Sequence, residues 1–206
     1  MIFESVCVGY MAANCYILAG EKNSKAVIID PGSDFKKIKQ ILDKHNLKTG
    51  LVINTHGHYD HIGCDDKFGV PVYIHKDDES LLRDSKLNLS GVFFMPYKVE
   101  SAINTVADGD SIGLDDITFK VIHIPGHTRG GAALLMTKPQ NNILFSGDTL
   151  FYHGIGRSDL PGGSEVLLIK SIKEKLLVLP DETIVYPGHG EPTTVKDEKA
   201  NNPFLS

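Results

Sequence analysis

Short apolar segments separated by Gly, Pro and Asp recur along most of the chain. Those rich in β-branched and aromatic residues predict β-strands. They span Ile2–Val8, Asn14–Ala19, Ala26–Ile29, Leu51–Ile53, Val72–Ile74, Ile117–Ile124, Ala132–Met136, Ile143–Phe145 and Thr183–Tyr186. Several of these segments end at Gly or Pro, which favour turns and so mark where the strands stop.

Three other segments predict helices. The first contains Phe35, Ile38, Ile41 and Leu42 at helical spacing, and either Ser33 or Asp34 can cap it. The second, Lys76–Arg83, is short. The third, Ser164–Leu179, begins at a capping serine and carries a stripe that we expect to face the core, made of Val166, Leu167, Ile169, Ile172, Leu176 and Leu177. Strands interspersed with helices predict an α/β layered domain whose helices cover its sheets.

Composition limits the class of protein. The chain has 206 residues, of which 41% are hydrophobic and 23% charged, values typical of one globular domain spanning residues 1–206. With 21 Lys and Arg against 26 Asp and Glu, the net charge is −5. A nucleic-acid-binding surface requires clustered positive charge, so we expect no nucleic-acid partner.

One uncharged stretch, Val6–Gly20, bears on targeting. It lacks the basic residues that begin a signal peptide, and it is too short to span a bilayer. Cys7, Cys15 and Cys64 are odd in number, and we expect them to be buried free thiols. These features predict a cytoplasmic protein that does not associate with membranes.

The segment Thr55–His61 contains four potential metal ligands, which are His56, His58, Asp60 and His61. It directly follows a predicted strand. Side chains two residues apart at a strand end can point the same way, so the first two histidines can bind one metal while Asp60 and His61 turn toward a second. Imidazole and carboxylate groups suit zinc, iron or manganese.

Three further candidates, His127, Asp148 and His189, each follow a glycine just past a predicted strand. Glycine allows the backbone to approach a metal without a Cβ clash. Loops at strand ends converge to form sites in α/β folds. Seven ligands, one of them a carboxylate able to bridge, predict a site for two metal ions, which lie about 3.5–4 Å apart in such enzymes.

These motifs resemble those of the metallo-β-lactamase-fold hydrolases, and among them most closely the small, single-domain glyoxalase II-like group. The matching residues are His56-x-His58-x-Asp60-His61, Gly-His-Thr at His127, Gly-Asp-Thr at Asp148 and Gly-His-Gly at His189. Further matches, Asn14-Cys15-Tyr16, Gly156–Asp159 and Asn202–Leu205, extend the resemblance over nearly the whole chain. The resemblance implies an αββα four-layer sandwich, in which two β-sheets are flanked by helices and a dinuclear metal site lies at one edge.

The resemblance also implies a role for each ligand. His56, His58 and His127 would bind the first metal, and Asp60, His61 and His189 the second, with Asp148 and a hydroxide bridging both. Two divalent ions, zinc as the first expectation with iron or manganese also fitting, lower the pKa of water toward neutrality. The bridging hydroxide would then attack the carbonyl of a small thioester or ester. Asp60 and Asp148 are the expected catalytic residues.

Other residues are candidates for supporting roles. Thr55, Thr128 and Asp30 are expected to orient ligands, although Asp30 equally fits a turn cap. The candidates for substrate contact are Tyr10, Phe94, His153 and Arg157. Arg157 can clamp a substrate carboxylate or pair with Asp159, and the aromatic segment around Phe94 can form an apolar rim or pack against a sheet.

The reaction has several alternatives. Only 206 − 189 = 17 residues follow His189, too few for the C-terminal helical domain of full-length glyoxalase II, and Arg157 and Asp159 stand where that enzyme has Lys and Tyr for glutathione. β-Lactamases of this fold lack a carboxylate matching Asp148. Gly156–Asp159 also resembles persulfide dioxygenases, which use one iron. The sequence therefore predicts a monomeric or homodimeric thioester or ester hydrolase, with a mononuclear iron dioxygenase and a non-catalytic metal-binding module as alternatives.

Overall fold

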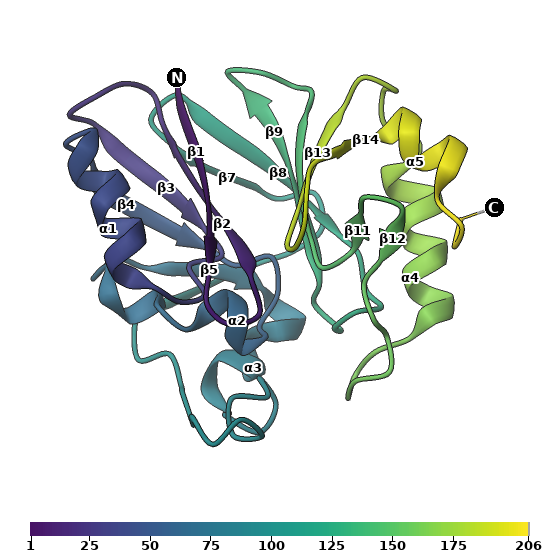
Figure 1. The fold of residues 1–206 in the computed structure, drawn as a ribbon, viewed down its shortest axis with the longest axis horizontal. Coiled ribbons are helices and arrows are strands. Elements are labelled where there is room, and N and C mark those ends of the chain that lie inside the picture. Colours follow the sequence, from purple (N-terminus) through teal and green to yellow (C-terminus); the bar gives the residue numbers. More distant parts are fainter. Residues whose placement is uncertain (206) are drawn as a thin grey trace.

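Two mixed six-stranded β-sheets lie face to face at the centre of the molecule in a computed structural model, which describes residues 1–205 (Figure 1). The first sheet has its strands in chain order. They are β1 (Ile2–Val8), β2 (Ala13–Ala19), β3 (Lys25–Ile29), β4 (Lys48–Ile53), β5 (Val72–His75) and β6 (Ile103–Val106). The first three strands are antiparallel, and β3 to β6 run parallel. The parallel half brings the carboxyl ends of β3, β4 and β5 to one edge.

The second sheet has the strand order β14-β13-β10-β9-β8-β7. Its strands are β7 (Ser111–Leu114), β8 (Ile117–His123), β9 (Ala132–Lys138), β10 (Ile143–Gly147), β13 (Ile184–Pro187) and β14 (Thr193–Thr194). Strands β10 and β13 are parallel, so both of their carboxyl ends also meet at one edge. A separate two-stranded ribbon is formed by β11 (Leu150–Phe151) and β12 (Gly154–Ile155).

Helices cover the outer faces of both sheets (Figure 1). The α-helices are α1 (Phe35–Lys44), α2 (Tyr59–Ile62), α3 (Glu79–Arg83), α4 (Glu165–Ser171) and α5 (Val195–Asn201). Short turns of 3-10 helix span Asp65–Lys67 and Lys76–Asp78, and a π-helical turn, Ile172–Leu176, continues α4. None of the helices among residues 1–205 is long and apolar enough to cross a bilayer.

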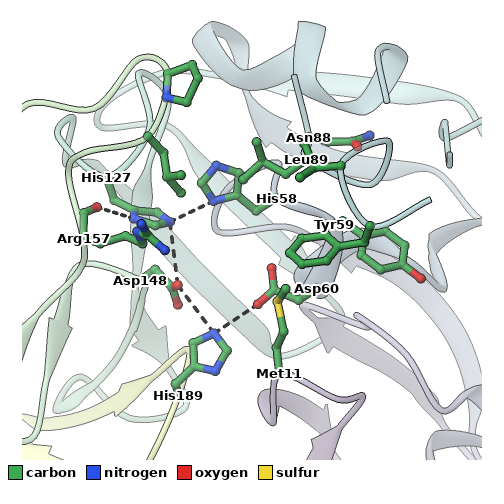
Figure 2. A pocket seen from close by; sticks show the side chains of 14 residues that line it. Met11, His58, Tyr59, Asp60, Asn88, Leu89, His127, Asp148, Arg157 and His189 are labelled. Carbon is green, nitrogen blue, oxygen red and sulfur yellow. Dashed lines mark hydrogen bonds and ion pairs between the residues drawn. The ribbon is translucent and has the colours of Figure 1, made fainter. Parts of the chain in front are cut away.

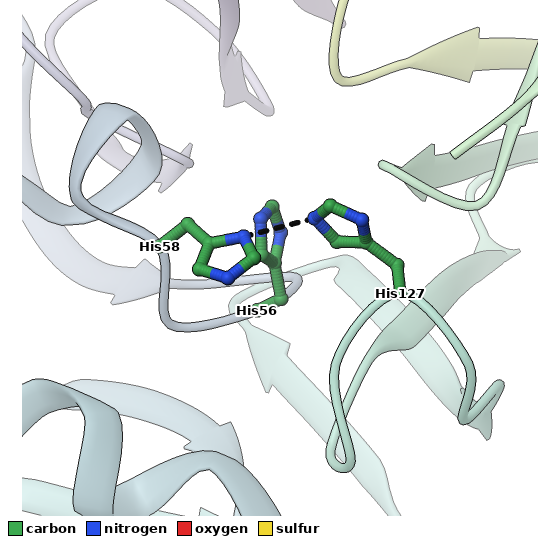
Figure 3. Close-up of side chains that lie close together, drawn as sticks. All are labelled: His56, His58 and His127. Carbon is green, nitrogen blue, oxygen red and sulfur yellow. Dashed lines mark hydrogen bonds between the residues drawn. The ribbon is translucent and has the colours of Figure 1, made fainter. Parts of the chain in front are cut away.

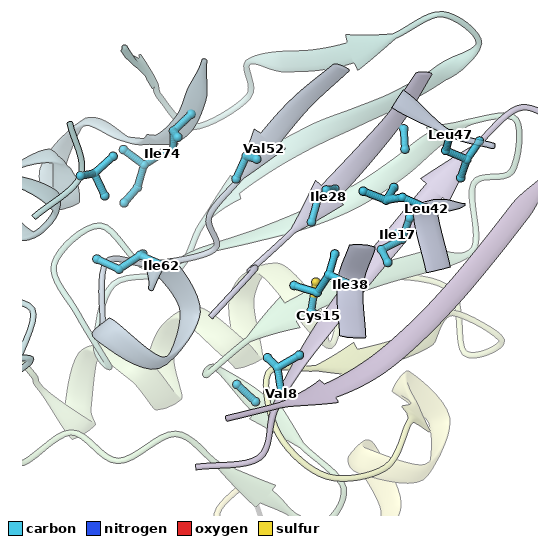
Figure 4. Close-up of a cluster of buried hydrophobic side chains, with 14 of the residues drawn as sticks. Val8, Cys15, Ile17, Ile28, Ile38, Leu42, Leu47, Val52, Ile62 and Ile74 are labelled. Atoms are coloured by element: carbon cyan, nitrogen blue, oxygen red, sulfur yellow. The ribbon is translucent and has the colours of Figure 1, made fainter. Parts of the chain in front are cut away.

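Three buried clusters hold these layers together. Between the sheets, residues such as Ile29, Ile53 and Phe145 pack face to face. On the outer face of the first sheet, Ile38 and Leu42 of α1 pack against strand residues including Ile17, Ile28 and Val52 (Figure 4). On the outer face of the second, the third cluster joins Leu144 and Val185 to Leu168, Ile172 and Leu176. The predicted arrangement of helix, sheet, sheet and helix is therefore confirmed.

The structure corrects two predictions about helices. Asp34 precedes α1 in a left-handed conformation with φ 52° and makes no capping hydrogen bond, because its carboxylate accepts the Gly9 N–H and pairs with Lys37 instead. Ser164 does cap α4. The predicted stripe on that helix is partly wrong, since Val166 is 78% exposed and Leu167 is 47% exposed. The buried face is formed by Leu168, Ile172 and Leu176, four residues apart and so on one side of the helix.

The cysteine prediction also needs one correction. All three thiols are free, and Cys15 and Cys64 are buried as expected, but Cys7 is exposed. Cys7 lies on β1, the edge strand of the first sheet, and its neighbours Val6 and Val8 face the opposite way. The alternation of side chains along the strand therefore directs its thiol away from the core.

Candidate metal centre

All seven predicted ligands lie together at one edge of the sandwich, on loops that follow strand ends. His56 and His58 follow β4, and Asp60 and His61 lie on the short helix α2 next to them. The other three come from the second sheet, where His127 follows β8, Asp148 follows β10 and His189 follows β13. Both sheets therefore contribute to the same cluster.

The ligand atoms form two groups. In the first, atoms of His56, His58 and His127 lie within 4.8 Å of one another, and His58 Nδ1 is 2.9 Å from His127 Nε2 (Figure 3). In the second, Asp60, His61 and His189 lie within the same limit, with Asp60 Oδ2 3.2 Å from His189 Nε2 and 3.6 Å from His61 Nε2. Each group has the size of the donor set around one cation.

Asp148 lies between the two groups. Its Oδ2 is 3.6 Å from His127 Nε2 and 3.5 Å from His189 Nε2 (Figure 2). Its Oδ1 is 3.4 Å from His61 Nε2. One carboxylate thus faces nitrogens of both groups. This is the position that a bridging ligand occupies.

Unpartnered atoms show that these residues fit metal ions. His56 Nε2 and Asp148 Oδ1 are both buried and have no hydrogen-bond partner. A buried polar atom without a partner costs about 1–3 kcal/mol, so native proteins seldom leave one unsatisfied. Both atoms point into the cluster of donor atoms, where cations would satisfy them. The donor set of imidazoles and carboxylates suits zinc, iron or manganese.

Asp30 orients ligands of both groups. Its Oδ1 accepts the Thr55 N–H at 2.7 Å, and its Oδ2 accepts the Thr55 hydroxyl at 2.7 Å and the His61 Nδ1–H at 3.0 Å. Because the Thr55 hydroxyl donates to Asp30, its oxygen accepts the His56 Nδ1–H at 3.2 Å. Both histidines are therefore held as the tautomer that leaves Nε2 free for a metal.

Two further contacts fix the loop that carries His127. Its Nδ1–H donates to the Arg157 carbonyl at 2.7 Å, which again directs Nε2 into the centre. Thr128, the next residue, donates its hydroxyl to the buried Asp78 carboxylate at 2.7 Å. Specific hydrogen bonds of Thr55, Thr128 and Asp30 thus support the orienting roles expected for these residues.

Asp78 is a site-supporting residue that the sequence analysis missed. Besides Thr128, its carboxylate accepts the Gly130 N–H at 2.6 Å and the Gly57 N–H at 3.1 Å. Gly57 lies between His56 and His58, so one buried carboxylate holds the loops from both sheets together. Its position in the sequence could have identified it, because Asp78 follows the end of β5 just as the ligands follow the ends of their own strands.

Glycine is required at two positions beside the ligands. A Cβ atom on Gly188 would lie 2.1 Å from Asp148 Oδ1 and 2.9 Å from His61 Cε1. Gly147 has a φ of 52°, and a Cβ there would lie 2.4 Å from the Thr55 hydroxyl oxygen. The expectation that glycine permits close approach of the backbone is therefore explained by direct steric contact.

The electrostatics divide the histidines into two kinds. Burial, together with the neighbouring imidazoles, lowers the pKa of His56 well below its usual value and that of His58 to about 3. Burial opposes charge on the other two as well, but nearby carboxylates raise the pKa of His61 well above its usual value and that of His189 to about 10. An imidazole binds metal only when it is unprotonated, so cations compete with the protons held at these two sites.

A cavity of about 480 Å³, here called the main cavity, opens onto the ligand cluster (Figure 2). Five of the predicted ligands form one wall, which are His58, Asp60, His127, Asp148 and His189. Much of the remaining lining is apolar and includes Met11, Leu89, Val92 and Phe93. A second cavity of about 230 Å³, here called the side cavity, shares Met11, Tyr59, Asp60 and Phe93 with it and adds Tyr10 and Met95.

The predicted substrate residues take four different positions. Arg157 lines the main cavity, and its guanidinium binds the Asp159 carboxylate through two bonds of 2.7 and 2.8 Å. Tyr10 lines the side cavity and is fully exposed. Phe94 is 94% exposed and lines neither cavity, whereas its neighbour Phe93 lines both. His153 lines neither cavity, and its Nε2 bonds the Asp197 carboxylate at 2.9 Å.

These features define a class of protein: a two-sheet α/β sandwich with a metal centre at the ends of its strands. The sequence profile of the Metallo-beta-lactamase superfamily matches residues 8–189. The chain therefore belongs to the metallo-beta-lactamase superfamily, whose members are usually metal-dependent hydrolases.

Curated relatives match over essentially their whole length. The uncharacterized protein Rv2581c of Mycobacterium tuberculosis is 42% identical, with 100% of this chain and 98% of the relative covered. A Bacillus subtilis protein named as a probable metallo-hydrolase, YqgX, is 36% identical over 100% and 98%. The hydroxyacylglutathione hydrolase GloC of Haemophilus influenzae is 33% identical over 100% and 99%.

Solved structures share the fold. The BLEG-1 B3 metallo-beta-lactamase superimposes with a TM-score of 0.91 at 37% identity, covering 100% of both chains. TTHA1623, solved in a di-iron-bound form, gives a TM-score of 0.83 at 33% identity and covers 98% of this chain and 100% of that one. ETHE1 from Myxococcus xanthus gives 0.80 at 27% identity and covers 98% and 84%.

Proposed function

We propose that this protein is a two-metal hydrolase of thioesters or esters, similar to the glyoxalase II group. The observation that carries the proposal is the position of Asp148, whose oxygens lie 3.4–3.6 Å from nitrogens of His61, His127 and His189 in two different ligand groups. The 33% identity to a hydroxyacylglutathione hydrolase and the di-iron form of a structural relative support it.

The metal ions, zinc as the first choice and iron or manganese as alternatives, would polarise the substrate carbonyl and lower the pKa of water when bound. His56, His58 and His127 would hold one ion, and Asp60, His61 and His189 the other. Asp30 keeps His56, through Thr55, and His61 as the tautomers required for binding. The Nε2 atoms of these two histidines are therefore directed into the centre before any ion arrives.

Asp60 and Asp148 are the proposed catalytic residues, because both carboxylates lie on the wall of the main cavity. Asp60 orients the attacking water by accepting its hydrogen bond and can take up its proton. The water oxygen forms a bond to the carbonyl carbon and the carbon–sulfur or carbon–oxygen bond breaks. The products are a carboxylic acid and a thiol or alcohol.

A second candidate reaction is hydrolysis of a β-lactam amide. One observation favours it, which is the TM-score of 0.91 and 37% identity to a B3 metallo-beta-lactamase. The same attack on a carbonyl carbon would open the ring. A chromogenic cephalosporin therefore belongs in the substrate panel.

Metal quantification combined with a substrate panel tests the proposal. The chain is purified without added metal, its metal content is measured, and hydrolysis of glutathione and non-glutathione thioesters is followed by thiol release. We expect about two metal ions per chain and thioester cleavage. One iron per chain with oxygen uptake on glutathione persulfide would instead support a dioxygenase, and metal binding without any turnover would support a non-catalytic module.

A further inference from the structure

The side cavity opens directly off the site where a substrate carbonyl would react. It shares Asp60, Tyr59, Met11 and Phe93 with the main cavity, so the two cavities adjoin at these side chains. Met95 lines only the side cavity. Apart from Asp60, its walls belong to no ligand group, and they begin beside this proposed catalytic carboxylate.

The side cavity offers no positively charged side chain to an anionic group of the substrate. Among residues 1–205, no lysine lines either cavity, and Arg157 is the one arginine that does. Its guanidinium is already paired with Asp159 through two hydrogen bonds, so it offers little free positive charge. Burying an unpaired carboxylate costs several kcal/mol. The side cavity, which contains Asp60 and no cation, therefore fits a neutral apolar group.

The loop that carries Leu89, Val92 and Phe93 forms the apolar wall of the main cavity. It is attached by hydrogen bonds to α2, the helix that contains Asp60. Asn88 accepts the Tyr59 N–H through its carbonyl at 2.9 Å, and its side chain donates to the Tyr97 carbonyl at 3.0 Å. Ser90 donates its N–H to the Asn88 side chain at 3.0 Å and accepts the Tyr97 N–H at 2.9 Å. Asn88 and Ser90 are buried, so the base of this loop is fixed next to Asp60.

The tip of the same loop is exposed and apolar. Val92, Phe93 and Met95 are between 48% and 65% exposed. Tyr10 and Met11 are also exposed, and they line the side cavity together with Phe93 and Met95. Monomeric proteins rarely expose a contiguous apolar patch without a binding role. An apolar ligand between these two segments would bury surface on both sides.

We propose that the side cavity binds the acyl group of the substrate, and that the natural substrate is a thioester or ester of an apolar, unbranched or aromatic acid. This inference rests on the proposed hydrolase function. The acyl group is the part of a biological thioester that is hydrocarbon, whereas the thiol part carries amides and charges that an apolar cavity would leave unsatisfied.

A chain-length series on the full-length, metal-loaded protein tests the inference. Acetyl, butyryl, hexanoyl and octanoyl thioesters of one thiol are compared below their micelle-forming concentrations, with thiol release as the readout. Complete burial of one methylene is worth a factor of about four. We expect kcat/KM to rise about tenfold for each added pair of methylenes. A flat or falling series would overturn the inference while leaving the hydrolase intact, and no cleavage of any member would overturn the hydrolase itself.

Two variants locate the effect. Met95→Ser changes only the side cavity and is expected to reduce kcat/KM for the octanoyl ester about tenfold and for the acetyl ester less than twofold. Leu87→Ser is the matched control, because Leu87 is similarly exposed in the same segment but lines neither cavity. It should leave the whole series unchanged. An equal loss in both variants would indicate adsorption to the apolar surface and would overturn the assignment of the side cavity.

The choice of acyl over thiol group is tested separately. Octanoyl and acetyl esters of glutathione are compared with those of an uncharged small thiol. We expect the ratio of octanoyl to acetyl rates to be the same, within about threefold, for both thiols. If the ratio instead depends on the thiol, with lengthening of the thiol part raising the rate, the side cavity holds the leaving group and the inference is wrong.

Discussion

The two walls of the main cavity are built in opposite ways. Behind the ligand wall, His56 and His61 are almost completely buried, and the Nδ1 atom of each has a hydrogen-bond partner. On the apolar wall, Val92 and Phe93 are 65% and 48% exposed. The first wall is held by directional bonds from buried carboxylates, and the second by contact between weakly packed side chains.

This contrast separates reaction from selectivity. Ligands must be held within a fraction of an ångström for two ions to bind, and buried hydrogen bonds provide that precision. An apolar wall requires only shape and the absence of charge, so its side chains can change without disturbing the ligands. Substitutions on the ligand wall should therefore affect every substrate equally, and those on the apolar wall should affect substrates by size.

The largest effect is expected from Asp148→Ala. Because this carboxylate faces both ligand groups, its removal should lower kcat at least about a thousandfold and reduce the bound metal below two ions per chain. Thiol release and metal quantification measure the two effects. The matched control is Asp110→Ala, which removes an exposed carboxylate from the turn before β7 and should change neither. Hydrolysis at the normal rate in the Asp148 variant would exclude a bridging role.

Asp30→Asn should produce the next largest effect. The substitution keeps the size of the side chain but removes the negative charge of the carboxylate, whose Oδ2 accepts the hydrogen bonds of His61 and Thr55. Loss of such a partner weakens metal affinity or activity by about 10–100-fold. Chelator competition and kcat/KM on any cleaved thioester are the measurements, and all substrates should lose by the same factor.

Asp65→Asn is the control for this variant. Asp65 is also buried, but its carboxylate touches Asn54 and no ligand side chain. Burial raises the pKa of Asp65 well above its usual value because desolvation disfavours the charged form, and a neutral amide of the same size carries no such charge. Metal affinity should stay within about twofold of the parent. Equal losses in Asp30→Asn and Asp65→Asn would show a general effect of buried substitutions.

Metal affinity should depend on pH. The pKa of His189 is raised to about 10, so the metal-free protein holds a proton there that an ion must displace. Affinity should rise about tenfold per pH unit for each displaced proton between pH 6 and 9, as measured by chelator competition. Because the pKa of His189 is higher in the folded state, its protonation stabilises the folded protein fully below the unfolded pKa of about 6.5. This stabilisation is lost as the pH rises toward the folded pKa of about 10. The Tm of metal-free protein should therefore fall over this range while the gain in Tm from added metal grows.

The smallest effect is expected from Arg157→Ala. The side chains of Arg157 and Asp159 are 62% and 68% exposed, and ion pairs as exposed as this one contribute little to stability. The backbone carbonyl that holds His127 remains in the variant. Denaturant unfolding should show a nearly unchanged midpoint, and acetyl thioester activity should be nearly unchanged as well. A large loss of activity would show that the guanidinium leaves Asp159 to bind substrate.

Sequence patterns predicted most of the central strands, because those strands are buried and strongly apolar. They did not predict β6, β7, β11, β12 and β14, which are two to four residues long and carry little hydrophobic pattern. The stripe on α4 was misjudged because Val166, Leu167 and Leu168 are consecutive and equally apolar. Only the position of the second sheet determines which of the three is buried.

The sequence by itself predicted the candidate ligand set, whose side chains the structure brings together. Its histidines and aspartates lie on segments that follow strand ends, and strand ends are local features that a pattern of apolar residues reveals. The tertiary structure alone decided what holds the ligands and what lies beside them. Asp78 and Thr128 are 50 residues apart and Asp30 and Thr55 are 25 apart, so no local pattern links them. The same applies to Phe93 and Phe94, because identical neighbouring side chains differ only in the direction that the folded backbone gives them.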